Sequence, residues 1–339
     1  MIGAQKYEDL LKKKEKLIFI DVRSPKEFEE AHIPNAVNIP VFDNLERELI
    51  GTLYKTEGKR TAIREALRII GPKVFDIYLE FEKCYKKDYE MIVYCARGGM
   101  RSSTITALLK EFSMPLAKLA GGYKGYRQYL NDTLPSLIKE FQIITLYGKT
   151  GTGKTNILKK MKEIGYDILD LEGCANNRGS LLGGIGLGEK HSQKYFESLV
   201  FESLLNAKTK TILTEGESRR IGNIVMPVFL NESLVSSRKL YIEASLEKRI
   251  ETIRKEYLKE NLDSNEIIEA ISKLKKYISH GQVDEYIAQI NNNEFDFVIS
   301  DLIEKYYDKV YSNKNKVYEK TFNNNDEEKC VSEIIEFLF

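Results

Sequence analysis

The segment Gly148-Lys149-Thr150-Gly151-Thr152-Gly153-Lys154-Thr155 constrains the fold of this chain more than any other. It fits the phosphate-binding pattern G-x-x-x-x-G-K-[ST], which needs a strand before it and a helix after it. Both are predicted, because residues 142–147 form an apolar run and residues 153–163 have a helical pattern. The backbone N–H groups of residues 149–155 would cradle a diphosphate, Lys154 would add positive charge, and Thr155 would hold Mg²⁺ if a metal binds. The segment therefore predicts a P-loop domain of α/β class.

A second anion site is predicted around Cys95, in Tyr94-Cys95-Ala96-Arg97-Gly98-Gly99-Met100-Arg101-Ser102. The apolar run 91–94 predicts a strand before this cysteine, and a helix is expected over 102–112. A thiol placed between a strand and a helix N-terminus faces backbone N–H groups, which stabilise a thiolate and attract anions. A buried structural cysteine needs neither glycines nor arginines beside it. The candidate catalytic residues are therefore Cys95, Arg97, Gly98, Gly99 and Arg101.

Alternating strands and helices continue on both sides of these two motifs and predict parallel α/β sheets. In the first half we expect strands at 17–22 and 116–119, a short helix from Pro25 to Ala31, a helix-rich region over 45–86, and a helix at 123–131. Around residues 133–140 the first series of alternating strands and helices ends and a second series begins. Two domains are therefore predicted, at residues 1–135 and 136–339.

In the second domain we expect strands at 166–170, 210–214 and 239–243, and a helix at 192–207. From residue 245 onward the pattern predicts amphipathic helices, interrupted by an apolar strand at Phe295–Ile299, and Ser312–Asn325 reads as a solvated loop. The apolar strand near 210–214 ends in Glu215 and Glu217, where an ATP-hydrolysing P-loop protein is expected to carry an aspartate. The P-loop is therefore predicted to bind a diphosphate without hydrolysing ATP.

Composition excludes several classes of protein. None of the 339 residues belongs to an apolar run of about 18, and the first residues lack a signal-peptide pattern, so a cytoplasmic protein is expected. The four cysteines form no C-x-x-C pair, so neither a metal site nor a disulfide framework is predicted. The net charge of +1 means that any nucleic-acid binding must depend on a local basic patch. The candidates are Arg178, Arg219 and Arg220, which lie beside carboxylates and glycines, and Arg60 and Arg64 with Lys55 and Lys59.

The first domain resembles rhodaneses over residues 5–132. The resemblance lies in Asp21–Phe28, His32–Pro40, the Cys95 loop and Gly121-Gly122-Tyr123. It implies a cysteine at the floor of a loop whose amides hold a persulfide or an oxyanion. Asp21 and Arg23 are expected to form a structural ion pair, and His32, which precedes Ile33-Pro34, is expected to pin a loop by hydrogen bonding. Many sulfurtransferase rhodaneses have four residues between the cysteine and the arginine, whereas this loop has five, Ala96 to Met100. That length resembles the loop of related phosphatases, which holds a tetrahedral phosphorus group.

Nearly the whole chain resembles the tRNA 2-selenouridine synthases. The shared motifs are Cys95–Ser102, Leu171–Gly173, Asn176–Ser180 and Glu217–Gly222. The resemblance implies replacement of sulfur by selenium in 2-thiouridine at the wobble position of tRNA. It also implies selenophosphate as the selenium donor, geranyl diphosphate as the source of an S-geranyl intermediate, and no tightly bound cofactor.

Two other functions fit the same motifs. One is a rhodanese-type sulfurtransferase or phosphatase fused to a regulatory P-loop ATPase. The other is a non-catalytic RNA-binding scaffold in which both sites are degenerate. The intact Cys95, Lys154 and Thr155 argue against the scaffold.

Overall fold

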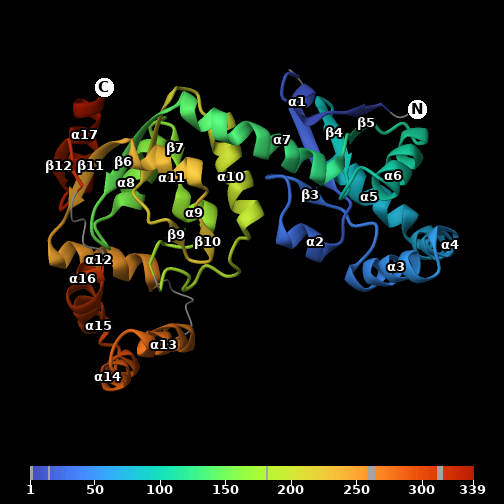
Figure 1. Cartoon of the computed structure of the whole chain (residues 1–339). Coiled ribbons are helices and arrows are strands. Elements are labelled where there is room, and N and C mark those ends of the chain that lie inside the picture. The colour runs from blue at the N-terminus through green and yellow to red at the C-terminus, as the bar shows by residue number, and fades with distance from the viewer. Residues whose placement is uncertain (1–2, 14–15, 181, 259–263, 311–315) are drawn as a thin grey trace. The chain divides into compact units, whose positions relative to one another are not determined.

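A computed structural model of the protein describes residues 3–13, 16–180, 182–258, 264–310 and 316–339. The chain divides into two compact units, Met1–Leu134 and Pro135–Phe339. Both units are built from a parallel sheet with helices, as the α/β prediction requires (Figure 1). Among the described residues, no helix is long and apolar enough to cross a membrane.

The first unit contains a five-stranded parallel sheet in the order β1-β5-β4-β2-β3. Its strands are β1 (Ala4–Gln5), β2 (Lys16–Asp21), β3 (Val37–Asn38), β4 (Tyr89–Tyr94) and β5 (Leu116–Leu119). The central strand β4 is buried from Met91 to Tyr94, as expected for a parallel sheet covered on both faces. Because β4 ends at Tyr94, Cys95 lies at the carboxyl edge of the sheet, where ligands bind in open α/β folds.

The helices of the first unit follow the predicted order. They are α1 (Tyr7–Leu10), α2 (Pro25–Glu30), α3 (Asn44–Thr56), α4 (Lys59–Ile70), α5 (Val74–Cys84), α6 (Met100–Glu111) and α7 (Gly122–Leu137), with a 3₁₀ turn at Gly71–Lys73. Helix α2 begins with the expected Ser24 cap, which forms a reciprocal capping box with Glu27. Helix α7 continues beyond the predicted end at residue 131, because Leu130 and Leu134 extend its buried face by one further turn.

The second unit has a five-stranded parallel sheet in the order β12-β11-β6-β8-β7. Its strands are β6 (Gln142–Tyr147), β7 (Ile168–Leu169), β8 (Thr211–Glu215), β11 (Arg238–Glu243) and β12 (Lys320–Asn323). A separate antiparallel pair consists of β9 (Arg220–Ile221) and β10 (Ile224–Val225). The P-loop follows the central strand β6, and β8 lies beside it, so Glu215 ends next to the phosphate-binding loop.

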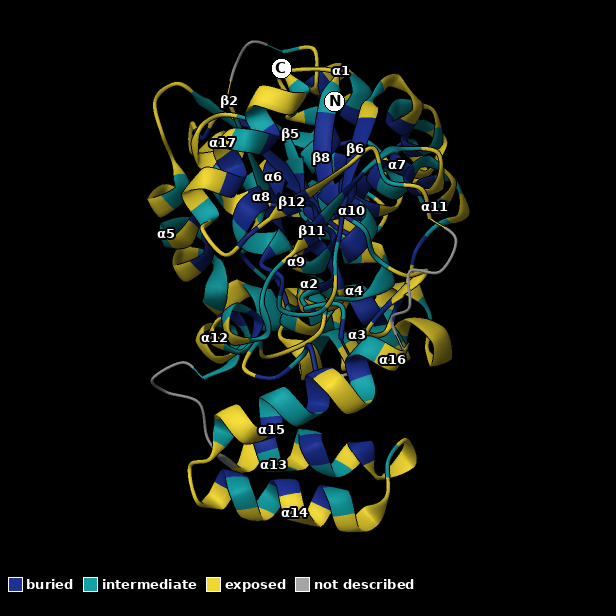
Figure 2. Ribbon diagram, turned by 90° about the vertical axis from the view of Figure 1, so that its left-hand side faces the viewer, coloured by how far each residue is buried: buried dark blue, intermediate teal, exposed yellow. Residues whose placement is uncertain are grey.

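Helices surround this sheet and continue into a C-terminal helical part. They are α8 (Lys154–Glu163), α9 (Leu171–Ala175), α10 (Gln193–Leu205), α11 (Val228–Val235), α12 (Leu246–Tyr257), α13 (Ser264–Ser272), α14 (His280–Asn291), α15 (Phe295–Leu302), α16 (Asp308–Val310) and α17 (Glu327–Leu338), with 3₁₀ turns at Ile138–Glu140 and Lys273–Lys276 and a π-helical turn at Ile303–Tyr307. Figure 2 shows α13, α14 and α15 stacked together, away from the sheet, with their buried faces turned toward one another.

Two predictions for the C-terminal part are wrong. Phe295–Ile299 is not a strand but the start of helix α15, whose buried Val298 and Leu302 are four residues apart, the spacing of one helix face. Ser312–Asn325 is not a loop throughout, because Lys320–Asn323 forms the edge strand β12 and buries Phe322. Residues 311–315 of that predicted loop lie outside the described residues.

Candidate active sites

Cys95 is almost fully buried at the C-terminal end of β4, with 3% of its surface exposed. Its Sγ lies 3.2 Å from the Oγ of Ser102 in the first turn of α6. Burial by itself would raise the pKa of the Cys95 thiol. The effect of burial is outweighed by hydrogen bonds from the Ser102 hydroxyl and from the backbone N–H groups of Ser102 and Arg97, and by the positive charge of Arg101. The pKa of the Cys95 thiol is therefore lowered. This setting favours the nucleophilic thiolate form.

The loop after Cys95 is held in shape by a second turn of the chain. The backbone N–H groups of Tyr123 and Lys124 donate to the carbonyl oxygens of Cys95 and Ala96, at 2.9 and 3.0 Å. Gly98 has a φ of +62°, which favours glycine, and a Cβ at Gly122 would collide with the carbonyl oxygen of Cys95. Gly98 and Gly122 are therefore needed for the close approach of these two turns.

The two arginines of the loop differ in their surroundings. Arg101 donates two hydrogen bonds to the carboxylate of Glu27, at 2.6 and 3.2 Å, and Arg47 lies 3.4 Å from the same carboxylate. Burial alone would raise the pKa of Glu27, but the Arg101 bonds dominate and lower it to about 2. Arg101 is thereby fixed beside the loop, while Arg97 is exposed at the surface.

The predicted structural roles of three further residues near the start of the chain are confirmed: Asp21 and Arg23 form an ion pair, and His32 holds a loop by a hydrogen bond. Arg23 Nη2 lies 2.6 Å from Asp21 Oδ2, and both side chains are buried. The Arg23 guanidinium also covers the ring of Tyr123 at 4.3 Å, which links this ion pair to the turn that holds the Cys95 loop. His32 Nδ1 hydrogen-bonds to the carbonyl oxygen of Phe28 at 2.8 Å and so pins its loop to helix α2.

The P-loop joins β6 to α8 as its sequence pattern requires. Gly151 and Gly153 each have a φ of +81°, which turns the chain into the N-terminus of α8. Lys154 Nζ lies over the loop and donates to the carbonyl oxygen of Gly148 at 3.1 Å, while Thr152 Oγ1 donates to that of Lys149 at 2.9 Å. The helix N-terminus, the loop amides and Lys154 together form an anion-binding cradle.

Residues far along the chain hold this cradle from outside, and sequence reasoning missed them. Arg249 of α12 donates to the carbonyl oxygen of Thr150 at 2.9 Å and pairs with Asp308 at 2.7 Å. Asp308 also pairs with Lys149 at 2.8 Å. Asn324, which follows β12, donates to the carbonyl oxygen of Thr152 at 2.8 Å. No short motif contains these residues, because only the fold brings them to the loop.

A polar pocket opens beside the P-loop and contains acidic side chains. It is lined by Tyr147, Gly148, Thr150, Gly151, Gly153, Lys154, Thr155, Glu172, Arg178, Gly179, Ser180, Gly216, Glu217, Ser218, Ile253, Glu256 and Tyr257. Thr155 Oγ1 donates to Glu172 Oε2 at 3.1 Å. Burial and the nearby charge of Glu217 raise the pKa of Glu172 to about 8, and burial also raises the pKa of Glu217 and of Glu256. These carboxyls therefore repel a bound phosphate less than ionised ones would.

Glu215 occupies the end of β8, where ATP-hydrolysing P-loop proteins carry a metal-binding aspartate. Its side chain is fully buried, and Oε1 accepts a hydrogen bond from the backbone N–H of Glu172 at 2.6 Å. Burial, reinforced by the charges of Asp170 and Glu172, raises the pKa of Glu215 well above its ordinary value. Glu215 thus holds the backbone of Glu172 in place.

The predicted basic contacts belong to both units of the chain. Arg178 lines the P-loop pocket, and its guanidinium covers the ring of Tyr257 at 4.6 Å. Arg219 and Arg220 are exposed and do not belong to the lining of that pocket. Arg60 and Arg64 are exposed on helix α4 of the first unit. Within the part of the chain that the structure describes, no group of three or more His, Cys, Asp and Glu side chains is arranged to hold a metal.

Comparison with known proteins identifies the family. Residues 141–337 match the family model described as the tRNA 2-selenouridine synthase AAA domain. The chain belongs to the tRNA 2-selenouridine synthase family. Residues 3–129 match the model of the rhodanese-like domain, in agreement with the resemblance found in the sequence motifs. Both matches fit the architecture of a rhodanese-like unit followed by a P-loop unit.

Curated relatives carry the same family name. The tRNA 2-selenouridine synthases of Pseudomonas syringae pv. syringae (strain B728a) and Bdellovibrio bacteriovorus are both 34% identical to this chain, over 70% of its length and 65% and 64% of theirs. That of Nitrosomonas eutropha is 32% identical, over 70% of this chain and 62% of the relative. The chain thus spans just under two thirds of the length of these relatives.

A solved structure is similar in sequence to part of this chain. It is the N-terminal domain of a putative ATP/GTP binding protein from Clostridium difficile 630, with 43% identity. It covers 38% of this chain and 98% of its own length, with a TM-score of 0.36.

Proposed function

We propose that this protein replaces sulfur by selenium in 2-thiouridine at the wobble position of tRNA, in two steps that use the two anion sites. The observation that most supports this proposal is that a chain of this family combines an intact P-loop with a cysteine loop of five intervening residues. In the first step geranyl diphosphate alkylates the sulfur at the P-loop. In the second step selenophosphate displaces the geranylated sulfur.

The first step needs stabilisation of a leaving diphosphate. The thiouridine sulfur forms a bond to C1 of the geranyl group, the C1–O bond breaks, and its electron pair leaves with the diphosphate. Charge builds up on the diphosphate oxygens, where the loop amides, the N-terminus of α8 and Lys154 would stabilise it. Electrostatic stabilisation of this kind is usually the largest single contribution to catalysis.

Alkylation of the sulfur also releases a proton. The C2–S bond becomes single and the C2–N3 bond becomes double, so N3 of the base must lose its proton to an acceptor. Glu172 lies in the P-loop pocket, 3.1 Å from Thr155, and its raised pKa of about 8 suits proton transfer near neutral pH. We assign it the role of general base.

Magnesium would fit the first step with residues already present. The Thr155 hydroxyl is a hard oxygen donor of the type that Mg²⁺ prefers, and Mg²⁺ takes further ligands from water and substrate phosphates. If bound, the ion would neutralise charge on the leaving diphosphate. We do not propose a tightly bound cofactor.

The Cys95 loop would serve the second step. The Cys95 thiolate attacks C2 of the base, the C2–S bond breaks, and geranyl thiol leaves after taking up a proton. Selenium of selenophosphate then attacks C2 and displaces the Cys95 sulfur, which leaves as the thiolate. Water then cleaves the Se–P bond and releases phosphate. The five-residue loop suits a tetrahedral phosphorus group, and the amides of Arg97 and Ser102 with Arg101 stabilise negative charge at the position of Cys95.

The overall proposal is tested by mass analysis of tRNA. A strain that lacks this gene should lose 2-selenouridine at the wobble position, and the gene supplied on a plasmid should restore it. Unchanged tRNA in the deletion strain would contradict the proposal and would favour the alternative of a rhodanese-type enzyme with a regulatory ATPase. Because the substrate is tRNA, we expect the reaction to occur in the cytoplasm.

The role of Glu172 predicts a pH dependence of geranyl transfer. A general base acts in its deprotonated form, and the pKa of Glu172 is raised to about 8, so the rate should rise with pH through this range and level off above it. Glu172→Gln should slow transfer by about 100-fold and remove this rise. Transfer rates measured between pH 6 and 9 check the prediction. A Gln variant that retains the wild-type rate and pH profile would rule out Glu172 as the base.

The basic face of α4 predicts a salt effect on tRNA binding. Arg60 and Arg64 lie one helical turn apart and are both exposed. If they contact phosphates, the slope of log affinity against log salt should become shallower by about 0.7–0.9 for each lost contact in Arg60→Ala/Arg64→Ala. Lys83→Ala/Lys87→Ala removes the same charge from exposed positions in the last turn of α5 and just after it, and should leave the slope unchanged. Equal slopes for wild type and the α4 variant would place the RNA surface elsewhere.

A further inference from the structure

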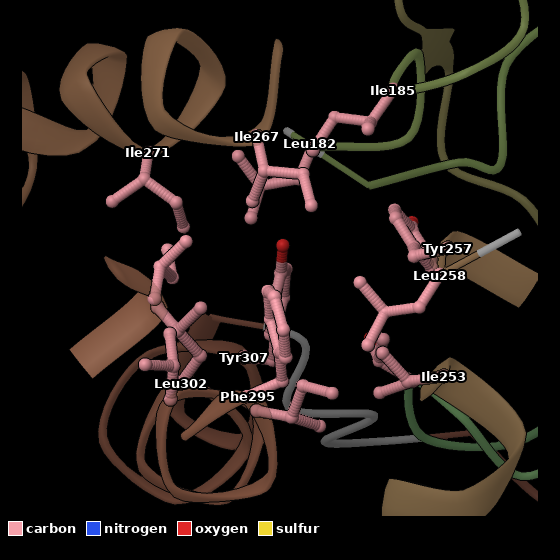
Figure 3. Close-up of a pocket in the computed structure, with 14 residues that line it drawn as sticks. Leu182, Ile185, Ile253, Tyr257, Leu258, Ile267, Ile271, Phe295, Leu302 and Tyr307 are labelled. Atoms are coloured by element: carbon pink, nitrogen blue, oxygen red, sulfur yellow. The ribbon is translucent and has the colours of Figure 1, made fainter. Parts of the chain in front are cut away.

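A second cavity of the P-loop unit is lined almost entirely by apolar side chains (Figure 3). Its volume is about 620 Å³ when the part open to solvent is included. Its lining residues are Thr150, Leu182, Ile185, Ile253, Tyr257, Leu258, Ile267, Ile271, Ile290, Phe295, Val298, Ile299, Leu302 and Tyr307. Such a lining suits a hydrocarbon and offers few partners to a polar ligand.

The cavity is formed where the C-terminal helices meet the P-loop part of the unit. Figure 3 shows Ile253, Tyr257 and Leu258 on one side, and Ile267 and Ile271 of α13 across from them. Leu182 and Ile185 belong to a glycine-rich loop at residues 182–188 and close the cavity from a further direction. Phe295, Leu302 and Tyr307 of α15 and the following turn form the remaining wall. The segment mistaken for a strand in the sequence therefore supplies one wall of this cavity.

The apolar cavity adjoins the polar pocket of the P-loop. Thr150, Ile253 and Tyr257 line both. At this junction Tyr257 is held by two groups of the polar pocket, because its hydroxyl lies 3.1 Å from Ser180 Oγ and its ring lies under the Arg178 guanidinium. One continuous site thus has a phosphate-binding end and a hydrocarbon-binding end.

We infer that the apolar cavity binds the hydrocarbon tail of a diphosphate ester whose head group lies in the P-loop. The inference rests on the proposed function, and it adds that the cavity, not the P-loop, selects the substrate. A nucleotide would place ribose and base next to isoleucine, leucine and phenylalanine side chains that cannot hydrogen-bond to them. The desolvation of those polar groups would be uncompensated, which disfavours ATP and GTP.

Tail burial also makes affinity depend on tail length. Each buried methylene group contributes about 0.8 kcal/mol, which is close to a fourfold change in affinity. A ten-carbon tail should therefore bind much more tightly than a five-carbon tail, and both should bind more tightly than inorganic pyrophosphate. Burial of apolar surface should also give a negative heat-capacity change on binding.

The test is calorimetric titration of the full chain with pyrophosphate, dimethylallyl diphosphate, geranyl diphosphate and ATP. We expect affinity to rise at least tenfold from the five-carbon to the ten-carbon ester. The heat-capacity change should be more negative for geranyl diphosphate than for pyrophosphate, and ATP should bind no more tightly than pyrophosphate. Equal affinities for geranyl diphosphate and pyrophosphate would overturn the inference.

Two variants that fill the cavity, with one control, locate the tail. Ile267→Phe on α13 and Leu182→Phe on the glycine-rich loop add volume to the lining from two separate segments of the chain and should weaken geranyl diphosphate binding about tenfold. Ile287→Phe places the same change on α14, where the side chain packs against the helical core without lining the cavity, and should leave both affinities unchanged. Pyrophosphate binding should persist in all three variants and so shows that the P-loop is intact. Unchanged geranyl diphosphate affinity in both cavity variants would overturn the inference.

The outcomes separate this inference from the proposed function. If geranyl diphosphate binds with the expected tail dependence but thiolated tRNA is never geranylated, the inference stands and the proposed function fails. If tRNA is geranylated equally by wild type and both cavity variants at limiting geranyl diphosphate, the function stands and the assignment of the cavity fails.

Discussion

Replacing Cys95 by serine should abolish selenation of tRNA while geranyl transfer continues. Serine keeps the size and the hydrogen bonding to Ser102, but it is not ionised at neutral pH, so the anionic sulfur is lost. The variant should then accumulate S-geranylated tRNA, because the first step depends on the P-loop unit. Mass analysis of tRNA treated with geranyl diphosphate and selenophosphate distinguishes the thiolated, geranylated and selenated forms.

The other cysteines provide matched controls for this experiment. Cys174 and Cys330 are buried, and burial raises the pKa of both thiols, most strongly for Cys174. Burial also raises the pKa of the partly exposed Cys84. None of these thiols should act as a thiolate, so their serine variants should still selenate tRNA wherever they fold. Equal selenation by wild type and Cys95→Ser would remove Cys95 from the proposed mechanism.

Replacing Lys154 by alanine should slow geranyl transfer by about 100- to 1,000-fold. This is the usual cost of removing one donor that stabilises developing negative charge. Lys154 Nζ lies over the loop, 3.1 Å from the carbonyl oxygen of Gly148, where it would contact the diphosphate. Selenation of tRNA that already carries the geranyl group should be affected much less, since no diphosphate leaves in that step. Transfer measured separately for each step checks this difference.

Two further measurements make the Lys154 result specific. Lys162→Ala removes a lysine from an exposed position of the same helix and should retain transfer. Intrinsic ATP hydrolysis by the wild type should be negligible, because Glu215 is buried and its Oε1 accepts a hydrogen bond from the backbone N–H of Glu172 where an ATPase carries a metal-binding aspartate. ATP turnover stimulated by tRNA would contradict the assignment of the P-loop to geranyl diphosphate and would favour the ATPase alternative.

Much of the fold could be predicted because the decisive signals are local. The strand, glycine-rich turn and helix around Cys95 and around Gly148–Thr155 are contiguous in sequence, and their backbone requirements are met by residues within a few positions. Alternation of such units is enough to predict parallel α/β sheets. The same local logic correctly predicted the Ser24 cap of α2 and the ion pair of Asp21 and Arg23.

Prediction of secondary structure from the sequence failed where an apolar run is short. Phe295–Ile299 contains as many apolar residues as a buried strand, and periodicity over five residues does not separate a strand from a helix. Tertiary packing stabilises the helix, because a helical α15 places Val298 and Leu302 on one face, where both pack into the core shared with α13 and α14. Conversely, the polar stretch before Asp326 contains β12, since pairing with β11 buries Phe322.

The sequence by itself determined the family, the two anion-binding loops and the residues within them. Only the tertiary structure decided what surrounds those loops. Arg249, Asp308 and Asn324 reach the P-loop from more than 90 positions away, and the apolar cavity draws its walls from segments between Thr150 and Tyr307. Backbone geometry of a loop is dictated by its own residues, whereas a cavity exists only where separate elements pack, and its shape is therefore a property of the folded chain.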